Sequence, residues 1–272
     1  MVDFDLTLDE EEAAYRSLCC LIYETLRDLK ERVGFIHECW RGTSDEEKAQ
    51  HVWCLALGVL AHDVGSGTLA LIDADRLRAA RILNRSLFEY HLRLRIYQAN
   101  ATEALCDAAD APKELRKFFE SRPVSEMSKL NISAEDLVQF QKFIDDNQGK
   151  LRRRNVWNDL KTINAEDHAQ AGFEYFNLYG FQSALSHGSG LVFKDVVQTR
   201  GETETVLAWK SPYISRFLVI DEVFVRLVGV LEAIEKTSRY FQAHVVINRK
   251  YHAIMRPIVE RFRAQQSLPP EV

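Results

Sequence analysis

Residues 73–97 read DADRLRAARILNRSLFEYHLRLRIY, a stretch that contains neither glycine nor proline. At about 100° per residue, one arc of such a helix is apolar and is expected to face a core. That arc comprises Ala79, Leu83, Leu87, Tyr90 and Leu94. The opposite side mixes arginines with the apolar residues Ile82, Leu92 and Ile96. Apolar residues on both sides predict a central helix with neighbours on two faces, as in an all-α bundle.

Apolar residues recur at helical spacing through most of the remaining chain. They predict a helix over 8–33 that continues past Gly34, and a second from Ser44 to about Val64. Ser44 and Glu47 have the spacing of a capping box, and 65–67 (Gly-Ser-Gly) is expected to break the second helix. Further helices are expected at 101–119, interrupted by Pro112, at 133–147, 151–163 and 166–187, from Pro212 onward, and at 244–265, with a break at Pro257 left open.

Two β-like runs, 191–197 and 205–209, predict a small β-hairpin inserted between residues 191 and 210. We find no internal repeat, low-complexity segment or linker. The expected architecture is therefore an all-α, multi-helix bundle forming a single helical domain over 1–272, with one hairpin insertion.

The composition, with 46% hydrophobic and 28% charged residues, is that of a soluble globular protein. It excludes a disordered chain, a collagen and a disulfide scaffold. The net charge of −5 combines an acidic start, 1–12, with basic segments at 76–95, 151–154 and 249–263. Basic stripes suit phosphate backbones, so RNA is one expected partner. The alternative is that these arginines pair with acids elsewhere, and the pI of about 5.9 favours it.

The five cysteines are odd in number and include no C-x-x-C pair, which predicts reduced thiols in a cytoplasmic protein. The acidic N-terminus does not resemble a secretory signal. The most apolar run, 52–72, contains Asp63 and the Gly-Ser-Gly break at 65–67, so we expect a buried helix and no membrane association. We expect no cofactor, because no phosphate-binding or dinucleotide motif occurs. We also expect no metal, because His51, His62 and Asp63 lack a diagnostic spacing.

Arg81, Arg85 and Glu89 form a ladder at i, i+4 and i+8 on residues 73–97. If this helix is central, Arg85 and Glu89 are partly buried. A guanidinium held by a carboxylate and aimed into a pocket is suited to anion recognition, so all three residues are candidate ligand-binding groups. The alternative is an ordinary surface pair worth a few tenths of a kcal/mol.

Tyr179, Ser183 and His187 form a second ladder with the same spacing, followed by Gly188 at a helix end. Tyr179 and Ser183 are candidate ligand-binding residues. His187 can titrate near neutrality, and beside Ser183 it is a candidate general acid or base. The alternative is structural, because a histidine at a helix end interacts with the dipole and hydroxyls satisfy buried backbone. No G-x-S-x-G motif supports a serine nucleophile.

Together, these two helices carry a family resemblance. The run 80–89 is similar to the R-x-L-x-E helix of an uncharacterised bacterial all-helical domain family, and Tyr179, Ser183, His187 and Gly188 resemble that family's later Y-x3-S-x3-H-G helix. The likeness covers about residues 49–190. It implies a helical fold and a shared polar site, without specifying a reaction.

A weaker resemblance is to the HEPN superfamily, helical proteins that include defence and toxin ribonucleases. Arg85 and His91 resemble its R-x4-6-H signature. The resemblance implies RNA cleavage without metal, in which His91 assists proton transfer and Arg85 stabilises phosphate. On a continuous helix these side chains lie about 120° apart, so they would converge only across a homodimer or at a kink.

Three functions therefore remain open. The first is a metal-independent ribonuclease. The second is a binding module that holds a small anionic ligand or a partner peptide between the two ladders, with Arg85, Glu89, Tyr179, Ser183 and His187 around one cavity. The third is an interaction protein whose polar ladders only fix the register of its helices.

Overall fold

The computed structural model describes residues 8–39, 44–104, 156–175, 197–200, 204–207, 215–238 and 242–266, with the single residues 107, 135, 138, 142, 145, 146 and 179. Its helices are α1 (Leu8–Cys39), α2 (Asp45–Asp73), α3 (Leu77–Ala99), α7 (Val156–Ile163), α8 (His168–Phe173), α11 (Arg216–Ser238) and α12 (Ala243–Gln266). The fold class is all-α, as the sequence predicts.

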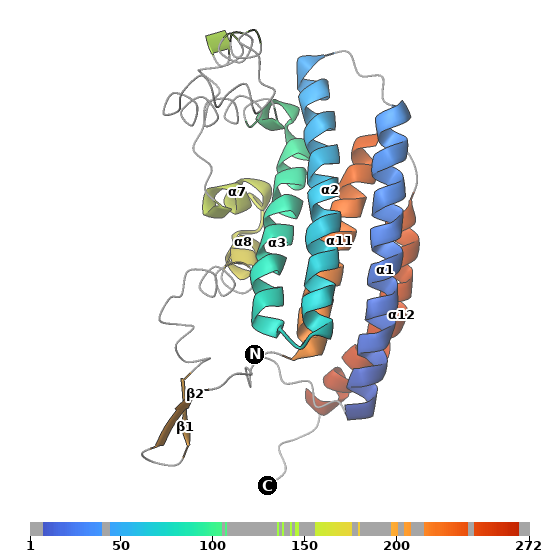
Figure 1. Ribbon diagram of the computed structural model, residues 1–272, viewed down its shortest axis with the longest axis vertical. Helices are drawn as coiled ribbons and strands as arrows, with labels where there is room; N and C mark the ends of the chain where they lie inside the picture. The colour runs from blue at the N-terminus through green and yellow to red at the C-terminus, as the bar shows by residue number, and fades with distance from the viewer. Residues whose placement is uncertain are drawn as a thin grey trace.

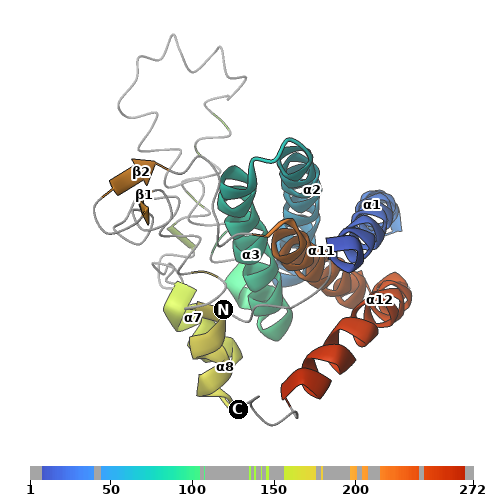
Figure 2. The same cartoon turned by 90° about the horizontal axis from the view of Figure 1, so that it is seen from below.

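Helix α11 lies at the centre of the bundle. It packs against α1, α2, α3 and α12, as the two orthogonal views show (Figures 1 and 2). Its buried apolar residues point in most directions around its axis, as expected of a helix with several neighbours. The buried set is Phe217, Val219, Ile220, Val223, Phe224, Leu227, Val228, Val230, Leu231, Ala233 and Ile234. The short helices α7 and α8 lie on the side of α3 that faces away from α1 and α12 (Figure 2).

Helix α2 is longer than predicted, because it continues through 65–67 to Asp73. A Cβ at Gly65 would lie 3.0–3.1 Å from methyl carbons of Leu227 and Leu26. This glycine therefore serves close packing against α1 and α11, and the predicted break is wrong. The predicted capping box at the start of α2 is confirmed. The Ser44 side chain accepts a hydrogen bond from the backbone N–H of Glu47, and the Glu47 side chain accepts one from the backbone N–H of Ser44.

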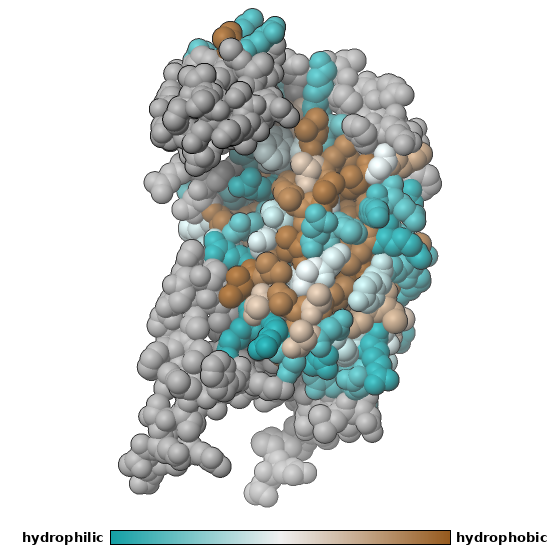
Figure 3. All heavy atoms as spheres, in the orientation of Figure 1, coloured by the Kyte–Doolittle hydropathy of each residue, from teal (hydrophilic) through white to brown (hydrophobic). Residues whose placement is uncertain are grey.

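Helix α2 is also apolar enough to raise the question of a membrane. Among the described residues, it alone has the length and composition of a membrane-spanning helix, with a mean hydropathy of 1.5 in its most apolar window. Of that window, 44% is buried by the rest of the bundle. Val52, Val59 and Leu60 of this helix are exposed. The visible face of the molecule has an apolar area in its middle (Figure 3).

Two other helices pass through residues that commonly end helices. Helix α1 continues through Gly34, as predicted, and α12 continues without interruption through Pro257, where the sequence leaves a break open. The turn between α2 and α3 contains Asp75 at a φ of 55°, a left-handed conformation that aspartate tolerates better than most residues. Helix α3 therefore begins four residues later than the stretch 73–97 suggests.

The remaining predicted elements are only partly described. Residues 101–104 are helical, whereas most of 105–155 lies outside the described residues. Helix α8 is followed by Glu174, Tyr175 and Tyr179 in π-helical conformation; Ser183 and His187 lie outside the described residues. Strands β1 (Val197–Arg200) and β2 (Glu204–Leu207) pair antiparallel, with Val197 opposite Leu207. The rest of 191–210 is not described, so the hairpin insertion as a whole stays a prediction.

Candidate functional site

Arg85 of α3 and Tyr179 beyond α8 meet although 94 residues separate them. Nη2 of Arg85 donates a hydrogen bond of 2.9 Å to the Tyr179 hydroxyl, and its Cζ lies 5.0 Å from the ring centroid. Nε of the same guanidinium donates to Oε1 of Glu89 at 3.0 Å. The side chains of Arg85 and Glu89 are 20% and 35% exposed, so solvent still reaches this ion pair. We call Arg85, Glu89 and Tyr179 the Arg85 site.

Aromatic rings extend from the Arg85 site to α7. Ring centroids of Phe88 and Tyr179 lie 5.7 Å apart, those of Tyr179 and Tyr175 also 5.7 Å, and those of Tyr175 and Trp157 5.1 Å. These distances fall in the range of favourable aromatic pairs. The sequence analysis missed this series, because the four rings come from three segments and no single helix shows them as a pattern.

Arg81 belongs to a different cluster, at the interface of α3 and α11. Its guanidinium pairs with Glu222, and Nδ2 of the fully buried Asn84 donates to Oε2 of Glu222 at 3.1 Å. Nη1 of Arg226 donates to the backbone oxygen of Asn84 at 2.7 Å, and its Cζ lies 5.2 Å from the Phe88 ring. Burial lowers the pKa of Arg226 to about 10, so it remains a cation at neutral pH.

The sequence analysis missed Glu222 and Arg226. The available signal was two charged residues, four apart, within the strongly apolar run 217–231 of α11. Buried charges of this kind require partners. Arg81, which was grouped with Arg85 and Glu89, pairs with α11 instead, because Glu222 and Asn84 lie within its reach.

His91 occupies the side of α3 that faces α11. A Cβ on Gly229 would lie only 2.4–2.8 Å from three atoms of the imidazole, so the ring lies directly against that backbone. Burial, with smaller contributions from Arg95 and Arg226, lowers the pKa of His91 to about 4. The imidazole is therefore neutral at pH 7. Since Arg85 contacts Tyr179 and His91 contacts Gly229, the two residues of the HEPN-like signature occupy different faces of α3.

A second polar network holds α8 against α3. Nη1 of Arg95 donates to Oε2 of the buried Glu174 at 2.8 Å, and its Nη2 donates to Oδ1 of Asn164 at 3.1 Å. Nε2 of Gln170 donates to the other oxygen of Glu174 at 2.9 Å. Glu174 lies directly before Tyr175, so this network positions the aromatic series relative to α3.

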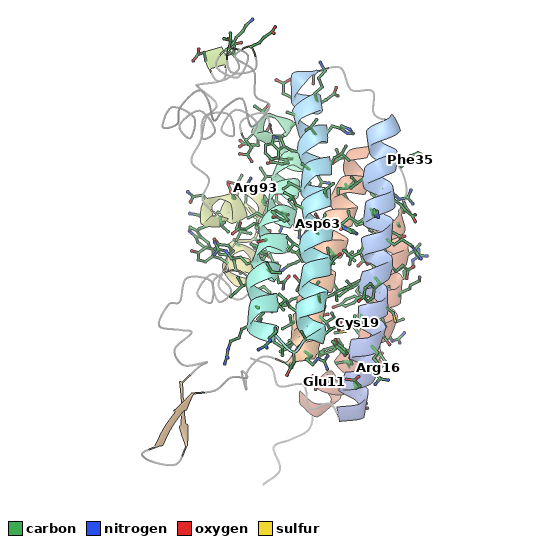
Figure 4. All side chains as sticks on the ribbon, viewed as in Figure 1. Glu11, Arg16, Cys19, Phe35, Asp63 and Arg93 are labelled. Carbon is green, nitrogen blue, oxygen red and sulfur yellow. The ribbon has the colours of Figure 1, made fainter. Side chains whose placement is uncertain are left out.

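Three of the five side chains expected around one cavity, those of the Arg85 site, lie together. The other two, Ser183 and His187, fall outside the described residues, and the functional roles of all five stay predictions. Within the described ranges, no group of three or more His, Cys, Asp or Glu side chains could hold a metal ion. His62 contacts its neighbour Asp63 at 3.2 Å on the outer side of α2, where Asp63 is labelled (Figure 4).

Comparison of the chain with models of protein families, with curated proteins and with solved structures gave no match.

Proposed function

We propose that this protein is a helical-bundle binding protein whose Arg85 site holds a small anionic ligand. The observation that carries the proposal is the hydrogen bond from Arg85 to Tyr179, which joins a half-buried guanidinium to a half-buried phenol across two segments. In this arrangement the guanidinium is fixed before a ligand arrives, which reduces the entropy lost on binding.

The chemistry of the Arg85 site favours an anion. Because the Tyr179 oxygen accepts from Arg85, its own O–H is directed elsewhere as a donor, and contact with a cation strengthens that donor. Glu89 orients the guanidinium from the side of α3. Arg226, buried behind Phe88, adds a positive charge that is weakly screened by water.

The test is calorimetric titration of the full chain with inorganic phosphate and with sulfate. Arg85→Gln removes the charge, and we expect it to weaken binding by about 10-fold or more, the loss typical of a hydrogen bond to a charged group. Tyr179→Phe keeps the ring and removes the hydroxyl, and we expect a smaller loss.

The matched control is Arg16→Gln. Arg16 pairs with Glu12 at the same i, i+4 spacing, but it is 75% exposed and lies on α1, remote from α3 (Figure 4). This variant is expected to bind as the original chain does. If neither anion binds, or if Arg85→Gln binds both normally, the proposal is wrong.

A HEPN-like ribonuclease is the second proposal, and it rests on the spacing of Arg85 and His91. His91 is neutral at pH 7 and can accept a proton, but burial makes the imidazole a weak base. Since Arg85 and His91 occupy different faces of α3, this reaction would need a homodimer or an opening of the α3–α11 contact. Labelled RNA incubated with chelator, and with His91→Ala and Arg85→Ala alongside, tests it. Cleavage that is unchanged in both variants would reject the assignment.

Several finer expectations accompany these proposals: the hairpin insertion, the cytoplasmic location, the lack of membrane association and the role in bacterial defence. They rest on the residue patterns alone.

A further inference from the structure

We infer that the anion held at the Arg85 site is carried on a planar aromatic ring, so that the ligand is an aromatic anion. This inference rests on the proposed function and specifies the ligand class. Nucleoside monophosphates and aromatic carboxylates share this chemistry.

The first step is the position of the ring series. It begins at the guanidinium itself, since Cζ of Arg85 lies 5.0 Å from the Tyr179 ring centroid, and Tyr175 is the next ring at 5.7 Å. The Tyr175 ring therefore lies within about 11 Å of the Arg85 charge. One small molecule with an acidic group and a ring can reach both.

The second step is exposure along the series. Phe88, at the inner end, is 5% exposed, whereas Tyr179, Tyr175 and Trp157 are only half-buried. The outer rings thus retain surface that a ligand ring can cover. Lys161, an exposed residue, places Nζ 5.3 Å from the Trp157 ring, so the outer end carries a cation as well. Aromatic side chains beside cations suit ligands in which a planar ring stacks and an attached acidic group pairs with the positive charge.

The third step is a comparison with the aromatic pair between α11 and α12. Phe224 and Tyr251 stack with centroids 4.6 Å apart, and the Tyr251 hydroxyl donates to Asp221 at 2.8 Å. The hydroxyl of that pair therefore already donates to a carboxylate within the bundle, as expected for a contact that only packs two helices together. At the Arg85 site the tyrosine hydroxyl meets a cation instead, which leaves its proton directed towards an acceptor.

The experiment compares four probes by calorimetry: AMP, indole-3-acetate, ribose 5-phosphate and adenosine. We expect at least one aromatic anion to bind about 10-fold or more tightly than ribose 5-phosphate, the gain typical of one stacked ring. Adenosine, which lacks the charge, is expected to bind more weakly than AMP. Comparison of AMP with indole-3-acetate distinguishes the two sources of the shared chemistry.

Two variants locate the ring contact. Tyr175→Leu and Trp157→Leu are each expected to reduce the affinity for the aromatic anion towards that for ribose 5-phosphate, while ribose 5-phosphate binding stays unchanged. Tyr23→Leu, at a 58% exposed tyrosine on α1, is the matched control. Circular dichroism establishes whether each variant is folded. If one of the two ring variants does not fold, the other one tests the ring contact.

The outcomes separate the inference from the proposed function. If ribose 5-phosphate and both aromatic anions bind equally, the anion site stands and the aromatic inference is overturned. If the ring variants leave aromatic binding unchanged, the inference is likewise overturned. If no anion binds, the proposed function fails and the inference fails with it.

Discussion

At the residue scale, Gly229 determines how closely α3 and α11 approach. We predict that Gly229→Ala lowers the free energy of unfolding by about 1–3 kcal/mol, because the new methyl group would lie 2.4 Å from Cε1 of His91. Urea unfolding followed by circular dichroism measures the change. Combining it with His91→Ala should recover part of the loss, since the smaller side chain vacates the space.

Gly34→Ala is the control for that prediction. Gly34 is also inside a helix, but a Cβ there would have nothing within 4 Å. The substitution is expected to raise the free energy of unfolding by up to about 1 kcal/mol through helix propensity alone. Equal effects at Gly34 and Gly229 would contradict the contact between Gly229 and His91.

The lowered pKa of His91 makes the stability depend on pH. The native imidazole titrates at about 4, compared with about 6.5 in the unfolded chain, so the unfolded state binds more protons between these values. The part of the free energy of unfolding that depends on His91 is fully present above pH 6.5. It is lost as the pH falls towards 4, and the total loss is about 3 kcal/mol. Urea titrations at pH 7 and pH 5 should show a smaller difference in His91→Gln than in the original chain.

Part of the Arg85 site follows from spacing alone. Arg85 and Glu89 are four apart on one helix, so their ion pair is a local consequence of the sequence. The contact with Tyr179 is long-range, and only the position of the second ladder suggested it. Glu222 and Arg226 could not be assigned to the α3 arginines, because which helix packs against α3 is not encoded in any local pattern.

At the element scale, helix ends were the least predictable features. The capping box of α2 could be predicted from the sequence, because its hydrogen bonds join residues only three positions apart. The end of α2 was not, because the glycine at 65 serves the packing of α1 and α11, and burial against them outweighs the propensity cost of about 1 kcal/mol. Helices α1 and α12 likewise pass Gly34 and Pro257, where packing along the rest of each helix maintains the backbone.

The start of α12 depends on a side chain from α11. Glu235, 1% exposed, accepts from the backbone N–H groups of Ala243 and His244 at 3.0 and 3.2 Å, and from Nδ1 of His244 at 2.6 Å. We predict that Glu235→Ala costs about 3 kcal/mol, because it leaves Arg32 and these amides without a buried carboxylate. Hydrogen exchange should accelerate in the first turn of α12.

The matched control is Glu232→Ala, on the same helix. Glu232 pairs with Lys236 at i, i+4, and both side chains are substantially exposed. An exposed pair of this kind contributes less than about 1 kcal/mol. Comparable losses in the two variants, or unchanged exchange in α12 after Glu235→Ala, would show that Glu235 does not cap α12.

At the scale of the whole molecule, the sequence was sufficient for the all-α class and for most of the long helices. It indicated that α3 has neighbours on two faces, which the contacts of α3 with α2, α11 and α7 match. It did not identify α11 as the helix with the most neighbours. That arrangement depends on which apolar faces meet, and many pairings of amphipathic helices satisfy the same local pattern.

The central position of α11 leads to a prediction about cooperativity. Leu227 is fully buried, and its two methyl groups pack directly against Gly65 of α2. We predict that Leu227→Ala lowers the free energy of unfolding by about 3–5 kcal/mol, through lost burial and the cavity that remains. Because α11 joins four helices, circular dichroism and tryptophan fluorescence should report one shared transition, shifted equally.

The control is Val225→Ala on the same helix. Val225 is 48% exposed, and its substitution should cost less than about 1 kcal/mol. Separate transitions for the two probes, or similar losses in both variants, would contradict a bundle organised around α11.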